Sequence, residues 1–471
     1  MLTRWFSLFV LLSLPSLRAE VEVGPLFRDH LVLQRDQPIT VWGVAAPGEG
    51  VRVTFEPHSV ATTAGGDGRW RLQLPGRKAS RSPQELVVEG TNRIVIRDVL
   101  VGDVWLCAGQ SNMQMSVQHA SHAEDEIAAA AHPLIREFKV AAQFATEPRD
   151  TVAGQWQVCS PTTVGSFSAT AYFFARDLHR ELDVPIGLVT SAYGNSPIAS
   201  WRDATALAAE PVVTQWWSRQ LAASPPPRPH RQPSVCFNGM IHPLLPFSLR
   251  GVLWYQGESD ASETPHLASL YARQFQGLIG EWRRHFGREL PFFWVQLAGF
   301  GKSGARDWVG VRAAQSTALA LPRTGQAIAI DVGDAANIHP KNKQAVGARL
   351  ARLALNREYG IAREDSGPVL VRSQRSSEGT VQLHFRPAEE LSSQGDLAAA
   401  FELAGADGRF QPASLATVSG QTVTLRAPGL RSPVAVRYAW MPLPAGALFN
   451  RAGLPAAPFQ ADLSAAPEAG R

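Results

Sequence analysis

The feature of this 471-residue sequence that most restricts its fold is a change of hydrophobic pattern near Leu100 and a second change near Gly360. Between these points, short apolar runs alternate with helix-length segments, which is typical of an α/β domain with a largely parallel sheet. Outside them, apolar and polar residues alternate with a period of two, as in half-buried strands. The sequence therefore predicts an α/β centre between two β-rich regions.

We divide the chain into a signal peptide at 1–19, a β-sandwich domain at 20–98, a catalytic α/β domain at 99–358 and a β-rich domain at 359–471. The first segment has a basic start, an apolar run of secretory length, and Ala19 where cleavage requires a small residue. An uncleaved signal anchor is the alternative. We expect a periplasmic or extracellular protein, with no membrane insertion after signal cleavage.

Individual elements can be predicted from the same patterns. In the centre we expect strands at 104–107, 186–190, 252–255, 292–297 and 327–330. Helices are expected at 169–182, about 204–222, 267–286 and 343–355. In the first β-rich region, the glycine-rich turn at 65–68 predicts a hairpin between the strand that contains Val53 and the one that contains Leu72.

Composition excludes several functions. The sequence has 45 Lys+Arg against 41 Asp+Glu, and a formal charge of +4 on so long a chain is too small to indicate nucleic-acid binding. Beyond the signal, no apolar stretch is long enough to span a bilayer. Cys107, Cys159 and Cys236 allow at most one internal disulfide, and neither their spacing nor the histidines suggest a metal site.

The ends of the predicted strands carry the residues that suggest a chemistry. Ligands of open α/β sheets bind beyond the carboxyl ends of the strands. Ser111, Gly194, Gln256 and the segment from Asp334 to His339 follow four of these strands. A hydroxyl nucleophile, a base and oxyanion donors are the parts of an acyl-transfer site. On local sequence alone, Ser111 could equally be an ordinary helix N-cap.

His339 is the best base among the twelve histidines. It precedes a predicted amphipathic helix, and Pro340 suits the first helical position. The positive end of that helix disfavours imidazolium, so the ring is available as a neutral base near pH 7. For His242, which leads into the next strand, a core or capping role is the better interpretation. His119 and His122 are expected to point along a helix away from Ser111.

Several motifs then carry a family resemblance. They read Gly-Gln-Ser-Asn-Met at 109–113, Asn-Gly-Met-Ile at 238–241, Trp-Tyr-Gln-Gly-Glu-Ser at 254–259 and Ile-His-Pro-Lys-Asn-Lys at 338–343. The chain resembles the sialate O-acetylesterase family of SGNH hydrolases almost from end to end. The resemblance implies a flavodoxin-like, three-layer α/β/α core with added N-terminal and C-terminal β-rich domains. It also implies a cofactor-free enzyme that removes O-acetyl groups from sugars.

The resemblance assigns roles to individual residues. Ser111 would be the nucleophile and His339 the base, with the backbone amides of Ser111 and Gly194 and the side chain of Gln256 as the oxyanion hole. Asn195, Glu258 and Arg202 are the expected substrate contacts. Family members often have Gly-Gly where this chain has Gly194-Asn195, which leaves the contacts near Asn195 open.

A second departure concerns the acidic residue of the catalytic triad. Family members often carry Asp two residues before the histidine, where this chain has Asn337. Asparagine cannot supply the negative charge that stabilises imidazolium. Either Asp334 reaches the His339 ring, or the site is a Ser–His dyad that a main-chain carbonyl orients. We favour the dyad and keep Asp334 as the alternative.

The substrate stays open at this stage. A 9-O-acetylated sialic acid would need a cation for its carboxylate, and Arg202, Arg312 and Lys341 are all conceivable. Acetylated plant or bacterial polysaccharides such as xylan are the alternative within the esterases. A carbohydrate-binding pseudoenzyme is the alternative from another class.

Overall fold

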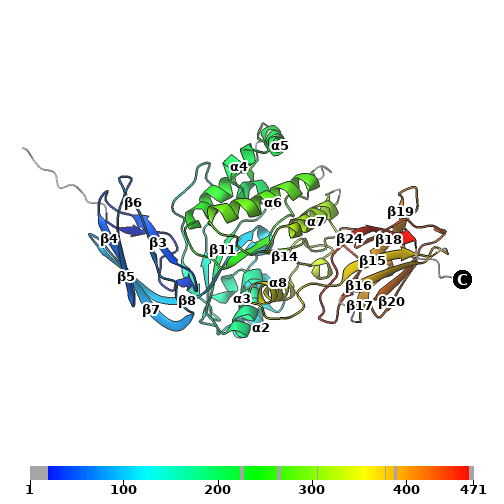
Figure 1. Cartoon of the computed structure of the whole chain (residues 1–471), viewed down its shortest axis with the longest axis horizontal. Helices are drawn as coiled ribbons and strands as arrows, with labels where there is room; N and C mark the ends of the chain where they lie inside the picture. The colour runs from blue at the N-terminus through cyan, green and yellow to red at the C-terminus, as the bar shows by residue number, and fades with distance from the viewer. Residues whose placement is uncertain are drawn as a thin grey trace, which may run out of the picture.

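The computed structural model describes residues 20–222, 227–261, 267–304, 306–376, 378–386 and 390–465. The predicted signal peptide at 1–19 lies outside the described residues. The chain is elongated, with its N-terminal strands at one end, its helices in the middle and its C-terminal strands at the other end (Figure 1). Within the described residues, no helix is both long and apolar enough to cross a membrane.

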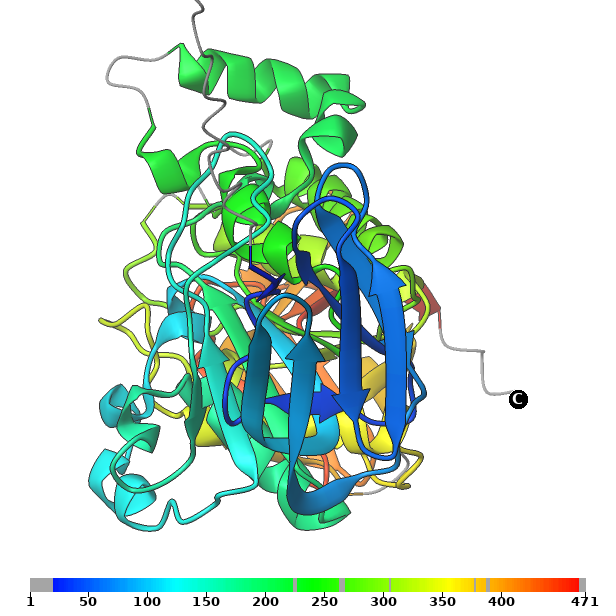
Figure 2. The same ribbon diagram turned by 90° about the vertical axis from the view of Figure 1, so that its left-hand side faces the viewer.

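The N-terminal β-rich region, drawn in blue in Figure 2, contains two sheets. In one sheet β3 (Ile39–Val44) pairs with β1 (Glu22–Val23) and β6 (Arg69–Leu74). The other contains β2 (Val32–Gln34), β4 (Gly50–Phe55), β5 (His58–Thr63), β7 (Ser80–Glu89) and the first half of β8 (Arg93–Gly109).

The predicted hairpin at 65–68 is wrong. An additional strand, β5, precedes this turn and pairs with β4, whereas β6 after the turn pairs with β3 in the other sheet. The turn therefore joins two sheets. β4 and β6 both alternate buried and exposed residues. This pattern is compatible with a hairpin of the two strands, so it could not exclude the wrong pairing.

The long strand β8 continues into the central sheet. Its second half pairs in parallel with β11 (Ile186–Ala192) on one side and with β12 (Gly251–Tyr255) on the other. Every residue of β11 and β12 is buried, as expected for a parallel sheet that is covered on both faces. The strand order therefore reverses at β8, and in such sheets ligands bind at the carboxyl ends of the strands around this point.

The rest of the central sheet extends in both directions from these strands. β13 (Phe292–Val295) and β14 (Thr324–Ala327) follow β12 in parallel, and β9 (Ile135–Lys139) and antiparallel β10 (Trp156–Val158) lie beyond β11. The strand predicted at 327–330 begins where β14 ends. Ile328 and Ile330 are apolar because they pack into the C-terminal core, and they form no strand.

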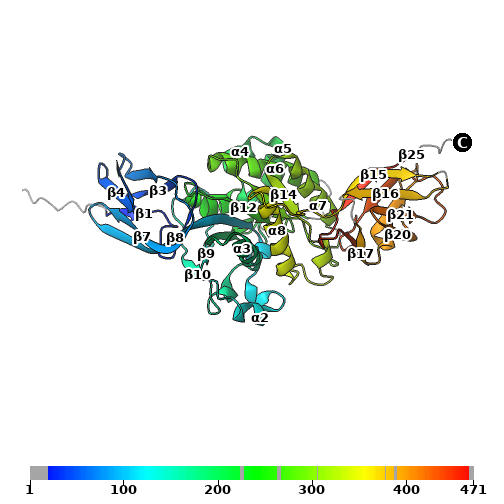
Figure 3. The same ribbon diagram turned by 60° about the horizontal axis from the view of Figure 1, so that its bottom comes forward.

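Helices cover both faces of the central sheet (Figure 3). On one face α3 (Ala169–Leu182) packs with α8 (Lys343–Arg357), and on the other α6 (Leu267–His285) packs with α7 (Trp308–Thr317). The predictions of α3, α6 and α8 are confirmed to within two residues at each end. Sequence analysis missed α7.

The helix predicted over about 204–222 is two helices. α4 (Ala204–Ala208) ends before Glu210, and α5 (Pro211–Leu221) begins at a proline, which suits a first helical position. The remaining α-helices are short: α1 (Ser111–Gln114) and α2 (Ala123–Ala128).

The C-terminal β-rich region contains three small sheets. Their strands are β15 (Val369–Arg375), β16 (Val381–Arg386), β17 (Ser392–Gly395), β18 (Phe401–Ala404), β19 (Phe410–Pro412), β20 (Leu415–Ser419), β21 (Thr422–Arg426), β22 (Ala435–Tyr438), β23 (Gly446–Phe449), β24 (Phe459–Asp462) and β25 (Ser464–Ala465). Arg312 of α7 donates to the carbonyls of Met441 and Pro442 at 2.8 Å each, which attaches this region to the centre.

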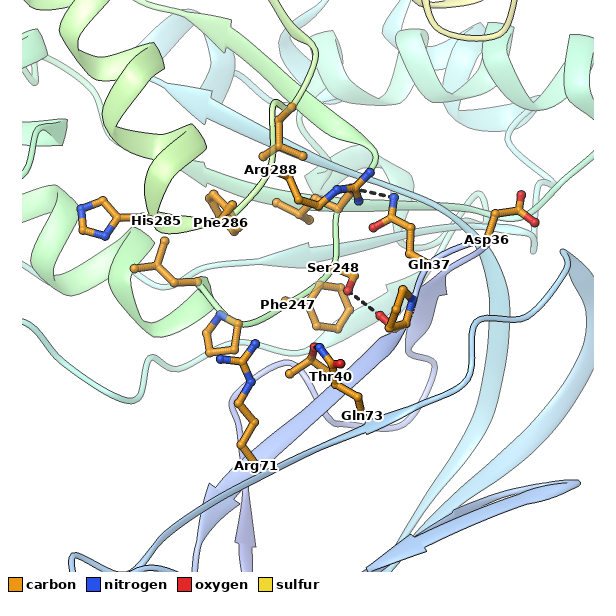
Figure 4. Close-up of a pocket in the computed structure, with 16 residues that line it drawn as sticks. Asp36, Gln37, Thr40, Arg71, Gln73, Phe247, Ser248, His285, Phe286 and Arg288 are labelled. Atoms are coloured by element: carbon orange, nitrogen blue, oxygen red, sulfur yellow. Dashed lines mark hydrogen bonds between the residues drawn. The ribbon is translucent and has the colours of Figure 1, made fainter. Parts of the chain in front are cut away.

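Two polar features mark the junction between the N-terminal region and the centre. Asp103 of β8 is fully buried between the guanidinium groups of Arg35 and Arg250. A cavity of about 680 Å³ opens nearby (Figure 4). Ser248 in its lining donates its hydroxyl to the carbonyl of Pro38, and His285 faces Asp203, so these two residues do not form a Ser–His pair.

The three cysteines are buried and unpaired in the part of the chain that the structure describes. They therefore act as small apolar residues of the core.

Candidate active site

Ser111 lies in a tight turn at the carboxyl end of β8. Gly109 has a φ of 140°, and a Cβ at this position would lie 2.2 Å from the carbonyl oxygen of Tyr255, so only glycine fits. The next residue, Gln110, donates its backbone N–H to the same carbonyl at 2.9 Å. This contact with the end of β12 ends the strand and presents Ser111 at the start of α1.

His339 lies in the loop before α8, and its Nε2 is 2.8 Å from Ser111 Oγ. Its backbone N–H donates to Asn337 Oδ1 at 2.9 Å, which fixes the turn of the loop. Burial lowers the pKa of His339, and the positive charge of Lys343 lowers it further. Both effects keep the imidazole neutral near pH 7, the form that can accept a proton from Ser111.

Asp334 does not contact the His339 ring. Its Oδ1 accepts hydrogen bonds from the backbone N–H groups of Ala336 at 2.7 Å and Asn337 at 2.9 Å. These bonds lower the pKa of the exposed carboxyl group and close a turn in the loop. In the described part of the chain, no group forms a hydrogen bond with His339 Nδ1, so the geometry is that of a dyad.

A cavity of about 510 Å³ opens above the Ser111–His339 pair. It is lined by Gln110, Ser111, Asn195, Arg231, Glu258, Ser259, Ala261, Arg306, Ile338 and His339. Two positive charges and one carboxyl group therefore face the space beside the nucleophile. Such a mixture of polar groups suits a hydroxyl-rich ligand that also carries negative charge.

The predicted oxyanion donors have different surroundings. Gly194 lies beside Ser111, since a Cβ on it would be 3.4 Å from Ser111 Cβ, and its N–H donates to Gln114 Oε1 at 2.9 Å. Gln256 is turned away from the cavity. Its amide nitrogen donates to Asp260 at 2.5 Å, and its Oε1 accepts from Tyr271 at 3.0 Å. The structure therefore brings Gly194 to the site and does not bring Gln256.

Of the predicted substrate contacts, Asn195 and Glu258 line the cavity. Asn195 has a φ of 59°, and its side-chain oxygen accepts from Arg231 at 2.5 Å. Glu258 is buried with Oε1 bound to Asn112 at 2.5 Å, whereas no described residue forms a hydrogen bond with Oε2. Burial raises the pKa of this carboxyl group.

Arg202 is not part of the site. Its guanidinium is buried and forms ion pairs with Glu281 of α6 and with Glu210. These ion pairs join α6 to the segment from Arg202 to Glu210. The other two cations that the sequence suggested are also absent from the lining. Arg312 binds main-chain carbonyls of the C-terminal region, and Lys341 is exposed outside the cavity.

Six of the lining residues were not predicted from the sequence: Gln110, Arg231, Ser259, Ala261, Arg306 and Ile338. The side-chain oxygen of Gln110 accepts hydrogen bonds from the N–H groups of Gly257 at 3.5 Å and Ser259 at 3.2 Å. Its amide nitrogen therefore points away from these two N–H groups. The position of Gln110 next to Ser111 could have suggested it. Arg231 ends the short 3₁₀ helix Pro229–Arg231 and Arg306 lies in a loop, and in such segments no pattern indicates which way a side chain points. Neither His119 nor His242 lines the cavity: His119 bonds Ser116, and His242 bonds the carbonyl of Arg149.

No group of three or more His, Cys, Asp or Glu side chains among the described residues could hold a metal ion.

Comparison with known proteins identifies the family. The sequence model of the sialic acid-specific acetylesterase family of carbohydrate esterases matches residues 101–356. Human sialate O-acetylesterase is 32% identical to this chain over 464 residues, which cover 88% of this chain and 87% of the human protein. The chain belongs to this family. The mouse sialate O-acetylesterase is 31% identical, with 93% of each protein covered.

A solved structure agrees with this result. A carbohydrate acetylesterase from Xanthomonas citri is 39% identical and superimposes with a TM-score of 0.84, covering 94% of this chain and 99% of that one. The protein is therefore a carboxylic ester hydrolase of the carbohydrate esterase type. The Ser111–His339 pair lies within the matched residues.

Proposed function

We propose that this esterase is a secreted serine enzyme that removes O-acetyl groups from sugars through an acetyl-Ser111 intermediate. The observation that carries the proposal is the 2.8 Å contact between His339 Nε2 and Ser111 Oγ at the floor of a polar cavity. We also propose an SGNH-type core for the central sheet, and a periplasmic or extracellular location from the predicted signal peptide.

In the proposed mechanism, neutral His339 accepts the proton of Ser111 while Oγ attacks the acetyl carbonyl carbon. The imidazolium then protonates the departing sugar oxygen, which leaves the acetyl group on Ser111. A water molecule loses its proton to the same ring, attacks the acyl-enzyme and releases acetate. The lowered pKa of His339 supports the role of the ring as a base.

Three donors are proposed for the oxyanion. The backbone N–H of Ser111 has no acceptor among the described residues, and that of Gly194 would exchange Gln114 for the oxyanion. Gln110 replaces Gln256 as the side-chain donor in this proposal, because it precedes Ser111 directly in the chain. The N–H groups of Gly257 and Ser259 hold its oxygen, so that its amide nitrogen can serve as the donor. Each donor of this kind is worth about 3 kcal/mol of barrier lowering.

On the sugar side, we propose that Glu258, whose side chain lines the cavity, turns its Oε2 to accept a hydrogen bond from a substrate hydroxyl, since this oxygen is buried and has no hydrogen-bond partner among the described residues. Arg306 is exposed at the cavity wall, and no described residue forms an ion pair with its side chain. It is the proposed contact for a sialic acid carboxylate, in place of Arg202. The names of the relatives support O-acetylated sialic acids as first substrates, and we propose the 9-O-acetylated forms among them.

The test is acetate release from a panel of O-acetylated sialic acids, xylan and bacterial glycans by purified protein, with Ser111→Ala as control. We expect release by the parent and a loss of about 10⁴-fold or more in the variant. Activity on neutral glycans alone would favour the polysaccharide alternative. Glycan binding without acetate release would favour the carbohydrate-binding pseudoenzyme, and acetate release at the parental rate by Ser111→Ala would refute the mechanism.

A further inference from the structure

Two buried polar residues lie behind the Ser111–His339 pair and take no direct part in the proposed mechanism. Asn112 and Lys343 are 1% and 0% exposed, and neither lines the cavity above the pair. A buried lysine is costly unless its ammonium group has partners, so its presence here requires a reason.

Their hydrogen bonds enclose His339 from both sides. Asn112 Nδ2 donates to the carbonyl of Ile338 at 3.1 Å, and Lys343 Nζ donates to the carbonyl of Pro340 at 2.8 Å. These are the residues immediately before and after His339. Because both flanking peptide groups are held, the direction in which the imidazole leaves the backbone is fixed.

A third bond joins the two residues to each other. Lys343 Nζ donates to Asn112 Oδ1 at 2.6 Å, and Asn112 follows Ser111 directly in the chain. These buried contacts therefore fix the position of the nucleophile relative to the base. They act in addition to the direct contact between Ser111 Oγ and His339 Nε2.

Glu258 completes the arrangement. Its Oε1 accepts from Asn112 Nδ2, so the amide of Asn112 lies between the carboxyl group of Glu258 and the ammonium group of Lys343. Lys343 also lies 5.2 Å from the centre of the Tyr255 ring. Burial raises the pKa of Glu258 and lowers that of Lys343 to about 7, while each charge favours the ionised form of the other.

We propose that Asn112 and Lys343, with Glu258 as counter-charge, form a positioning unit that orients His339 and so takes over the orienting role, but not the charge, of the acidic residue of a triad. This inference rests on the proposed function. It accounts for an esterase site in which Asn337 stands where an aspartate is common and Asp334 is turned to its own loop. The three residues come from three of the motifs in the sequence.

The unit has an electrostatic effect that simple packing lacks. The ammonium group of Lys343 disfavours imidazolium at His339, so its removal raises the pKa of His339. Among the described residues, the other charged groups that line the cavity beside the ring are Glu258, Arg231 and Arg306. A pH profile therefore reports on Lys343 separately from stability.

The experiment compares Lys343→Met with Lys341→Met in the full chain. Both changes remove one positive charge within four residues of His339 in the chain, but Lys341 is exposed and outside the cavity. The substrate is p-nitrophenyl acetate, which has no carboxylate, and kcat and KM are measured across the range in which imidazole titrates. Thermal melting of each variant checks that it is folded.

We expect Lys343→Met to lower kcat by about 100-fold with KM unchanged, as for a displaced catalytic group. The acidic limb of its kcat/KM profile should move to higher pH, while Lys341→Met retains the parental values. A folded Lys343→Met with the parental kcat, or with a lower kcat and an unmoved limb, overturns the proposal.

A second variant covers the case in which Lys343→Met fails to fold. Asn112→Asp is nearly isosteric and still accepts from Lys343, but it can donate neither to the carbonyl of Ile338 nor to Glu258, and it sets a second carboxyl group beside Glu258. We expect kcat to fall by about tenfold or more, since the orientation of the base loses one hydrogen bond directly and the contact with Glu258 as well. The parental kcat in this variant would overturn the proposal. Absence of esterase activity in the parent would instead refute the proposed function.

Discussion

Replacement of Asp334 distinguishes a catalytic dyad from a triad more directly than any other change. Asp334 and His339 are five residues apart in one loop, so a carboxylate that stabilised the imidazolium would be a reasonable expectation. The structure instead shows the Asp334 carboxylate bound to the N–H groups of Ala336 and Asn337. The change Asp334→Asn keeps an oxygen that can accept both of these bonds, and it removes only the charge.

The two mechanisms predict very different magnitudes. In a triad, exchange of the acidic residue for its amide lowers kcat by about 10⁴-fold. In the dyad, Asp334→Asn should keep kcat within about threefold of the parent, because both turn bonds survive and no bond to the ring is lost. Asp334→Ala loses both bonds and loosens the loop, so a fall of about tenfold is expected from two weakened backbone contacts. His339→Ala removes the base itself and should cost about 10⁴-fold or more.

The assay is the initial rate of p-nitrophenyl acetate hydrolysis by the four purified proteins, with melting temperatures measured in parallel. Single-turnover measurement of acetylation separates the first chemical step from release of acetate. A loss in Asp334→Asn that approaches the loss in His339→Ala would refute the dyad. It would show that the loop rearranges when substrate binds, so that Asp334 reaches the ring.

The remaining predictions concern stability and substrate choice. Asp103→Asn breaks a buried ion-pair cluster with Arg35 and Arg250 and should cost about 3 kcal/mol, lowering the melting temperature by about 6–12 °C, while Asp36→Asn at an exposed ion pair should change it little. Desolvation alone would raise the pKa of Asp103, but Arg35 and Arg250 together outweigh it and lower this pKa. The stabilisation is therefore complete above the ordinary aspartate pKa and is lost as pH falls through the lower value of the folded protein. The free energies of unfolding of the parent and Asp103→Asn, measured with urea, should therefore converge in acid. Arg306→Gln should raise KM for acetylated sialic acid by about tenfold and leave p-nitrophenyl acetate hydrolysis unchanged; equal KM values for both proteins on sialic acid would remove Arg306 from substrate recognition.

Sequence patterns predicted the elements of the centre better than their connections. α3 and α8 have a strong helical period with polar N-caps, Ser168 and Asn342, and both begin at the predicted residue. The partners of β5 and β6 could not be predicted, because a two-residue period says which face is buried and nothing about which strand is adjacent. The apolar run at 327–330 suggested a strand, but its isoleucines are apolar because they contact the C-terminal region.

Within the site, position in the chain was predictable and side-chain direction was not. Ser111 and His339 follow strand ends, where the topology requires ligand-facing residues. Gln256 also follows a strand end, but Asp260 and Tyr271 draw its amide into the core. Arg202 is held by Glu281, which lies 79 residues further along the chain. Such partners become neighbours only after folding.

The structure also separates the chemistry of the acetyl group from recognition of the sugar. Ser111, Gly194 and His339 lie at strand and helix ends that the central sheet holds, and Asn112 and Lys343 support them from within the core. Arg231 and Arg306 on the sugar side lie outside the sheet and the long helices, in a short 3₁₀ helix and a loop that line the cavity. Loop residues can change without disturbing the core, because they contribute little to its packing. One acyl-transfer centre could therefore serve different acetylated sugars, and the identity of the sugar should follow from the two arginines.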